Sequence, residues 1–143
     1  MAVVLAASGC GEDDGAAETA AALSKAEFTE QANAICAKAN QEITKTSEQF
    51  AKENLSEEER PTTAQISELA KLALPTINRQ LEELRALGAP AGDEQEVDAI
   101  FAAAEEALAE GEQEPIAIYG ANGGAFEKAN QLATAYGLDK CGE

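Results

Sequence analysis

The sequence predicts an all-α fold, an antiparallel four-helix bundle whose second helix is kinked at Pro75 and which one disulfide staples. Three observations predict it: apolar residues recur at helical spacing in four stretches, no stretch alternates like a strand, and the connections are short. The chain of 143 residues is long enough for one domain with a modest core. We divide it into a partial signal segment and lipobox (1–10), a flexible acidic tether (11–23) and the helical domain (24–142).

The first helix is expected from Ser24 to about Asn54. Ser24 and Glu27 have the spacing of a capping box, in which each side chain bonds the backbone N–H of the other. Asn33 and Asn40 flank the apolar face, and we expect them at its hydrated boundary. At 100° per residue one face collects Phe28, Ala32, Ile35, Cys36, Ala39, Ile43 and Phe50.

The second helix is expected from Pro61, which suits a first helical turn, to about Leu87. Pro75 interrupts it but projects away from the apolar face. We therefore expect a kinked continuous helix, with two separate helices as the alternative. Gly88 and Pro90 end the helix. Its apolar face collects Ile66, Leu69, Ala73, Ile77, Leu81 and Leu84.

The third helix is expected over about 94–110, with Asp93 and Glu96 as a second capping box. Residues 111–124 are rich in turn-forming glycines, and Ile116–Tyr119 form an apolar patch within them. The inner face of the third helix collects Val97, Ile100, Phe101, Ala104 and Leu108.

The last helix is expected over about 125–136. Gly137 is placed as a left-handed C-cap, after which Leu138 folds back on the helix. Cys141 then lies within reach of a neighbouring helix. The inner face of this helix collects Ala125, Phe126, Ala129, Leu132, Ala133 and Tyr136.

The net charge of the chain limits the classes of partner that it can bind. A net charge of −17 excludes nucleic acid, whose phosphates the chain would repel, and electrostatic docking on anionic lipid. Acidic residues without a base gather in the third helix and its flanks, which is typical of a solvated face. The alternative is a docking face for a basic partner or for loosely bound divalent cations. This candidate docking face comprises Asp93, Glu94, Glu96, Asp98, Glu105, Glu106, Glu110, Glu112 and Glu114.

The N-terminus resembles a lipobox. Cys10 follows a short apolar run that ends in small residues, and an acidic stretch follows it. Its thiol would carry a diacylglyceryl group and hold the protein at the outer face of the cytoplasmic membrane. The apolar run is shorter than a full signal peptide, and no base precedes Lys25, so we expect a longer natural N-terminus. The alternative is a free thiol in a tail.

The lipobox assignment separates Cys10 from the other two of the three cysteines. With Cys10 assigned to lipid, Cys36 and Cys141 remain, and in an exported protein such a pair is expected to form a disulfide. By the loop-entropy model, a disulfide that closes a loop of about 100 residues stabilises the folded state by roughly 4–5 kcal/mol. The alternative is two buried free thiols in a cytosolic protein. The chain has no His and no Cys-x-x-Cys spacing, so we expect no metal site and no cofactor.

Three segments together resemble a group of uncharacterised small secreted lipoproteins of Gram-positive bacteria. They are 24–36, which ends in Ala-Asn-Ala-Ile-Cys, 84–90, and 136–142, which reads Tyr-Gly-Leu-Asp-Lys-Cys-Gly. The resemblance covers about 24–142. It implies an exported, lipid-anchored helical domain with its two cysteines paired, and it carries over no active site.

The leading functional hypothesis is a non-enzymatic interaction module in the cell envelope that binds another envelope protein or a wall component. It would dock through the acidic residues or through Ile116–Tyr119. The alternative is a small-ligand carrier or sensor with a cavity between helices, for which the candidate lining is Phe50, Phe101, Phe126 and Tyr136.

An enzyme is not expected. Acid–base catalysis of the glycosidase type needs two carboxylates that face one site. The adjacent acids Glu82-Glu83 and Glu105-Glu106 point in different directions on a helix.

Overall fold

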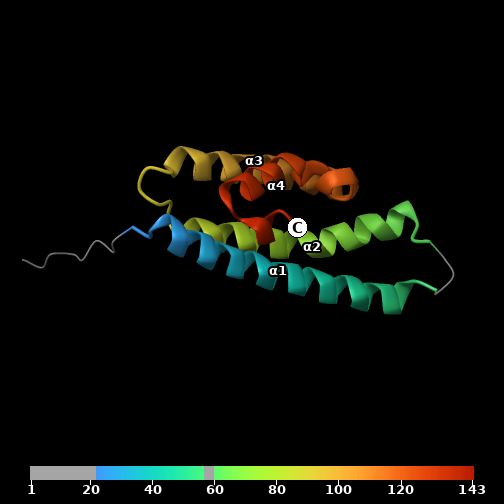
Figure 1. Ribbon diagram of the computed structural model, residues 1–143. Coiled ribbons are helices and arrows are strands. Elements are labelled where there is room, and N and C mark those ends of the chain that lie inside the picture. Colours follow the sequence, from blue (N-terminus) through green and yellow to red (C-terminus); the bar gives the residue numbers. More distant parts are fainter. Residues whose placement is uncertain (1–21, 57–59) are drawn as a thin grey trace, which may run out of the picture.

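The structure, a computed structural model, describes residues 22–56 and 60–143. Within these ranges every regular element is a helix, so the prediction of an all-α fold is confirmed (Figure 1). The α-helices are α1 (Lys25–Asn54), α2 (Thr63–Ala86), α3 (Glu94–Gln113) and α4 (Glu127–Tyr136). Short 3-10 helices follow α3 and α4, namely η1 (Pro115–Ile118), η2 (Ala121–Phe126) and η3 (Asp139–Cys141).

The helices lie in two layers (Figure 1). In one layer α1 and α2 run side by side as a long hairpin, and in the other α3 lies beside α4. The layers meet where α2 contacts α3 and where η3 contacts α1. Buried side chains between the layers form the core: Phe28, Ala32, Cys36, Leu81, Leu84, Val97, Ile100, Phe101, Leu108, Ala133, Tyr136 and Leu138.

Within α1, fully buried residues occur only in the first half of the helix. Its buried residues are Phe28, Ala32, Cys36 and Ala39, and none follows within the helix. Phe50, predicted on the same apolar face, is only half-buried. In Figure 1 this end of the hairpin extends beyond α3 and α4, so the facing helix α2 is its main cover.

The two long helices begin at capping boxes. At α1 the backbone N–H of Glu27 donates to Ser24 Oγ, and the Glu27 carboxylate accepts from the backbone of Ser24, as predicted. At α2 the box is formed by Thr62 and Gln65, a pair that was not predicted. Pro61 therefore lies outside the helix, not in its first turn.

α2 runs without a break through Pro75, whose ring is exposed. The alternative of two separate helices is therefore excluded. The exposed ring agrees with the predicted orientation away from the apolar face, where the lost backbone hydrogen bond is exposed to water.

The predicted capping box at the start of α3 is wrong. Asp93 is the N-cap residue, but its side chain makes no capping hydrogen bond with Glu96 or the backbone. Its carboxylate instead accepts a hydrogen bond from Tyr136 Oη at 2.7 Å and pairs with Lys25 Nζ at 3.2 Å. These tertiary partners take the place of the predicted local motif.

Residues 111–126 differ from the predicted turns. α3 continues past 110 to Gln113, and Gly111 packs tightly inside it. A Cβ at Gly111 would lie 2.6 Å from Ile118 Cγ2 and 3.0 Å from Leu74 Cδ2, so the missing side chain lets η1 lie close against α3 and α2. η2 then delays the start of the last helix to Glu127.

The C-terminal end of α4 follows the prediction. Gly137 is the C-cap with φ 105°, in the left-handed region. The backbone N–H of Leu138 donates to the carbonyl oxygen of Ala133 at 2.8 Å, and the Leu138 side chain is buried. The chain therefore turns back toward α1.

Candidate functional site

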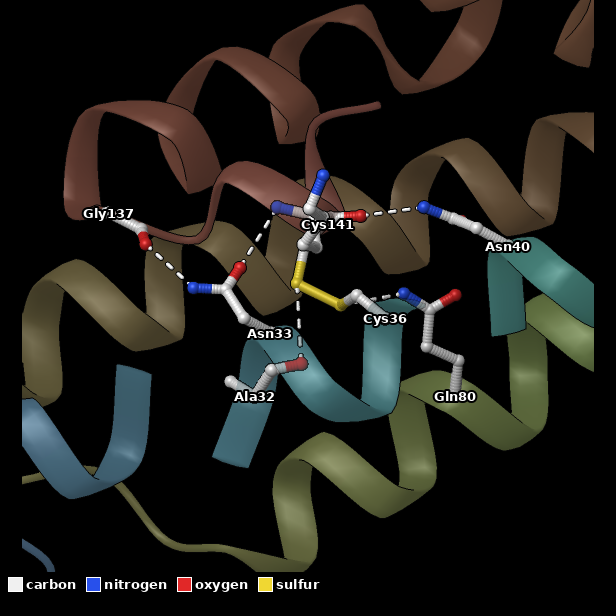
Figure 2. The surroundings of a disulfide bond; sticks show 8 residues. Ala32, Asn33, Cys36, Asn40, Gln80, Gly137 and Cys141 are labelled. Atoms are coloured by element: carbon white, nitrogen blue, oxygen red, sulfur yellow. Dashed lines mark hydrogen bonds between the residues drawn. A yellow bond between two sulfur atoms is a disulfide. The ribbon is translucent and has the colours of Figure 1, made fainter. Parts of the chain in front are cut away.

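A disulfide joins α1 to the C-terminal segment (Figure 2). Cys36 and Cys141 are bonded with their Cα atoms 5.0 Å apart, so the predicted pairing is confirmed. Gln80 of α2 donates from Nε2 to Cys36 Sγ at 2.9 Å, and Cys141 Sγ lies 3.8 Å from the carbonyl oxygen of Ala32. The bridge thus sits where α1, α2 and η3 meet.

Two asparagines of α1 hold the same segment by hydrogen bonds. Asn33 donates from Nδ2 to the carbonyl oxygen of Gly137 at 3.0 Å, and its Oδ1 accepts from the backbone N–H of Lys140 at 2.9 Å. Asn40 donates from Nδ2 to the carbonyl oxygen of Lys140 at 2.8 Å. With Cys36 between them, these side chains attach the C-terminal segment along one face of α1 (Figure 2).

Both asparagines were predicted at the hydrated boundary of the apolar face, and their hydrogen bonds to the C-terminal segment were not predicted. A signal existed: Asn33, Cys36 and Asn40 lie at i, i+3 and i+7, which places them on one face of a helix. Because Cys36 was expected to bond the chain end, its neighbours on that face were candidates to bind the same backbone.

A pocket of about 200 Å³ lies next to the disulfide, between the two layers. Every helix contributes to it, and most of its lining residues are apolar and either buried or half-buried. The large apolar side chains in its wall include Leu81, Leu84, Ile100, Phe101, Leu108 and Phe126. A cavity of about 150 Å³ lined by such residues stays dry and binds benzene. The pocket is therefore large enough for a small apolar molecule.

The polar lining is sparse. Asn40, Gln80 and Asn130 contribute amides, and Glu143 contributes a carboxylate. Glu143 is the one exposed residue among the described residues of the lining, so it marks the open side of the pocket. A mostly apolar wall with a few polar groups at one side is typical of small-molecule sites.

Two of the four residues predicted to line a cavity line this pocket, and two do not. Phe101 and Phe126 line the pocket. Phe50 lies in the second half of α1 and does not reach it, and Tyr136 faces another part of the surface.

Tyr136 belongs to a polar cluster at the start of α1. Its hydroxyl donates to Asp93, its ring makes an edge contact with Phe28, and Lys25 Nζ lies 4.1 Å from the ring centroid. Burial and the bond to Asp93 raise the pKa of Tyr136 above its usual value. The Tyr136 hydroxyl, and then Lys25, lower the pKa of Asp93. The adjoining depression is larger, about 400 Å³, but mainly exposed residues line it, among them Lys25 and Glu96.

The candidate docking face is exposed apart from Asp93, which is half-buried. Lys25 pairs with Glu96 at 3.8 Å. Arg85 pairs with Glu105 at 2.5 Å. Acids that make no ion pair with a described residue are Glu94, Asp98, Glu110, Glu112 and Glu114.

The apolar patch Ile116–Tyr119 is mostly covered. Ile118 is buried against α2 in the small cluster with Ala70 and Ala73, and Ile116 is half-buried. Tyr119 exposes 41% of its surface and is the main accessible part of the patch.

The predicted lipidation site, Cys10, and most of the predicted tether lie outside the described residues. Leu23, the last residue of that tether, packs against the core. In the described part of the chain, no helix combines the length and the apolar character needed to cross a membrane.

Comparison with known proteins finds no match: no protein-family model, no curated protein and no solved structure is similar to this chain at a significant level. The resemblance to small secreted lipoproteins stays a prediction from the sequence. Function is therefore inferred from the residues and their geometry.

Proposed function

We propose that this chain is an exported, lipid-anchored and non-enzymatic domain that binds a small apolar ligand. The observation that carries the proposal is the pocket of about 200 Å³ beside the Cys36–Cys141 bridge. Water gains little along the apolar wall, which offers it no hydrogen-bond partners, whereas an apolar ligand is removed from water by lying against that wall. The disulfide supports the pocket by fixing the C-terminal segment at its rim.

The experiment that tests binding is a benzene titration of the ¹⁵N-labelled protein followed by amide chemical shifts. We expect shifts at residues around the pocket, among them Ala104 and Ala129, and saturation at millimolar benzene. Ala104→Leu should abolish the shifts, because a leucine at this half-buried lining position fills the pocket. Ala102→Leu is the matched control, since Ala102 is exposed on the same helix and leaves the pocket open.

Both variants are checked by their melting temperatures. Ala104→Leu should be at least as stable as the parent chain if it fills empty space, and destabilised by about 1–3 kcal/mol if the site is already packed. A destabilised Ala104→Leu together with no benzene shifts in the parent would overturn the proposed pocket.

The extracytoplasmic location has separate support. The Cys36–Cys141 disulfide is of the kind that persists in oxidising compartments, and the sequence around Cys10 resembles a lipobox. The intact mass of the natural protein from its membrane, unreduced, tests both. A diacylglyceryl mass on Cys10 with two hydrogens fewer than the dithiol is expected, and an unlipidated, reduced chain would contradict the location.

We propose the finer architecture as an antiparallel four-helix bundle with α2 bent at Pro75. Contacts of α2 with both α1 and α3, and of α3 with α4, support the bundle. Residual dipolar couplings of α2 test the bend: the two halves of the helix should report different axis directions, and Pro75→Ala should align them. A single axis in the parent chain would contradict the bend.

The second candidate function is an interaction module that docks through α3. Its support is the exposed acids of α3 that pair with no described base, such as Asp98 and Glu110. Crosslinking in the native envelope should yield one specific adduct that disappears when Asp98, Glu110, Glu112 and Glu114 are changed to amides. Neutralising Glu30 and Glu48 of α1 is the control and should keep the adduct. Equal loss in both variants would indicate nonspecific charge attraction.

A further inference from the structure

We propose that the ligand of this pocket is a small aromatic amine, bound with its ring between the layers and its ammonium group at the open side. This inference rests on the proposed function above and names its ligand class. Four properties of the pocket lead to it: its charge, its free hydrogen-bonding groups, its size and its aromatic wall.

The charge of the lining excludes an anionic head group. Among the described residues, Glu143 is the one charged residue that lines the pocket, and no Lys or Arg does. A carboxylate ligand would lose hydration without gaining a cationic partner, within a chain of net charge −17. Fatty acids and other apolar carboxylates therefore do not fit.

Glu143 is able to receive the ammonium group. Its carboxylate pairs with Lys140 Nζ at 2.5 Å, and both side chains are about half exposed. Exposed ion pairs contribute little to stability, so a ligand cation can replace Lys140 at low cost. Lys140 itself does not line the pocket.

The wall offers several free hydrogen-bond acceptors. Asn40 and Gln80 each use one side-chain N–H, on the carbonyl oxygen of Lys140 and on Cys36 Sγ, and keep the second one free. No described residue donates to their side-chain oxygens, and the amide of Asn130 has no partner among the described residues. A head group that donates several hydrogen bonds matches these oxygens, and an ammonium group has three donors.

The size and the wall favour one aromatic ring. Compared with about 150 Å³ for a benzene site, about 200 Å³ accepts about six to ten non-hydrogen atoms. Phe101 and Phe126 line the pocket and offer ring edges and faces to an aromatic guest. An aromatic face also attracts a nearby cation. Arg85 already lies over the Phe101 ring, with its Cζ 5.4 Å from the ring centroid, so Phe126 is the lining ring that has no described cation over it.

Three probes that share one phenylethyl or benzyl body test the inference: phenethylamine, 2-phenylethanol and phenylacetate. Each is titrated into the ¹⁵N-labelled full chain at pH 7 and low ionic strength. We expect phenethylamine to bind at least 10-fold more tightly than phenylacetate, with the alcohol between them. Ala104→Leu should abolish binding of all three, and Ala102→Leu should leave it unchanged.

The role of the head group is tested by Glu143→Gln. This change should weaken phenethylamine about 3- to 10-fold and leave 2-phenylethanol unaffected. Glu30→Gln is the matched control, because Glu30 is an exposed acid far along α1 from the pocket wall and should change neither affinity.

The outcomes separate the two proposals. If the alcohol binds in the pocket but the amine binds no more tightly than phenylacetate, the ligand class is overturned and the pocket stands. The ligand class is also overturned if amine shifts map to the acids of α3 and persist in Ala104→Leu. If benzene and all three probes fail to bind, the proposed function falls with it.

Discussion

The two ends of the α1–α2 hairpin are held in different ways. The clamped end, residues 25–40 of α1 with the facing part of α2, lies under α3 and α4 and is tied to the C-terminal segment by the disulfide and two asparagines. The arm, residues 44–54 and 63–69, extends beyond that layer (Figure 1). Its tip is joined by a hydrogen bond from Gln65 Nε2 to the carbonyl oxygen of Asn54 at 2.8 Å.

The apolar pattern is similar in both regions, but burial is not. Phe28 and Cys36 at the clamped end are fully buried, whereas Phe50 and Leu69 in the arm are half-buried. Periodicity decides which side of a helix faces its partner, and a second layer decides how completely that side is covered. Local stability should therefore fall from the clamped end to the arm.

The largest effect is expected from removing the disulfide. Cys36→Ser with Cys141→Ser frees a loop with a sequence separation of 105, which loop entropy values at up to about 4–5 kcal/mol. Urea unfolding measures the loss. Hydrogen exchange should accelerate strongly in residues 28–39 and 129–141 and little in the arm, which already opens locally.

Reduction of the parent chain is the control for the two new hydroxyl groups. It should lower the free energy of unfolding by a similar amount. A loss below about 1 kcal/mol in both cases would show that Asn33, Asn40 and packing suffice to hold the C-terminal segment, against the loop-entropy estimate.

Two leucines of α2 compare the regions directly. Leu84, 6% exposed at the clamped end, should cost about 2–4 kcal/mol when changed to Ala, because the change leaves a cavity under a second layer. Leu69, half-buried in the arm, should cost about 1 kcal/mol. Chemical denaturation of both variants measures the difference, and equal losses would contradict the division into two regions.

The sequence predicted what depends on neighbours along the chain. The cap at Ser24, the left-handed Gly137 and the continuity of α2 through Pro75 follow from local chemistry. The pairing of Cys36 with Cys141 followed from counting cysteines.

Tertiary partners decided the rest. The Asp93 side chain bonds the Tyr136 hydroxyl and does not form the expected cap. Tyr136 belongs to α4, so this contact joins residues too far apart in the sequence for a local motif to predict it. Gly111 lies inside α3 and not in a turn, because Ile118 occupies the space where a side chain at position 111 would lie. The pocket lies between layers, so its lining could be guessed for Phe101 and Phe126 but not for Asn130.

A smaller effect is expected at the asparagine clamp. Asn33→Ala leaves the carbonyl of Gly137 and the N–H of Lys140 without their side-chain partner, which should cost about 1–2 kcal/mol. Asn54→Ala is the matched change in the arm, where the exposed amide bonds the carbonyl of Phe50 within the same helix, and it should cost less than about 0.5 kcal/mol. Thermal unfolding compares the two. A larger loss for Asn54→Ala would place the tighter attachment in the arm.

The smallest effect concerns pH and again separates the regions. The folded pKa of Asp93 is lowered, so its contribution to stability is present above its unfolded pKa of about 3.9 and is lost as the pH falls below it. The folded pKa of Tyr136 is raised, so its contribution is present below its unfolded pKa of about 10 and is lost as the pH rises above it. Melting temperatures from pH 2 to 11 should therefore decline at both limits.

Tyr136→Phe removes the hydroxyl that links the two titrations, so it should flatten both the acid and the alkaline decline. Tyr119→Phe is the sharper control. Burial raises the pKa of Tyr119, but no carboxylate accepts its hydroxyl among the described residues, so this change should flatten only the alkaline decline. If Tyr119→Phe also altered the acid limit, the acid dependence would not come from Asp93. If Tyr136→Phe altered neither the acid nor the alkaline decline, the hydrogen bond from Tyr136 of α4 to Asp93 would not stabilise the clamped end. The disulfide and the two asparagines alone would then distinguish the clamped end from the arm.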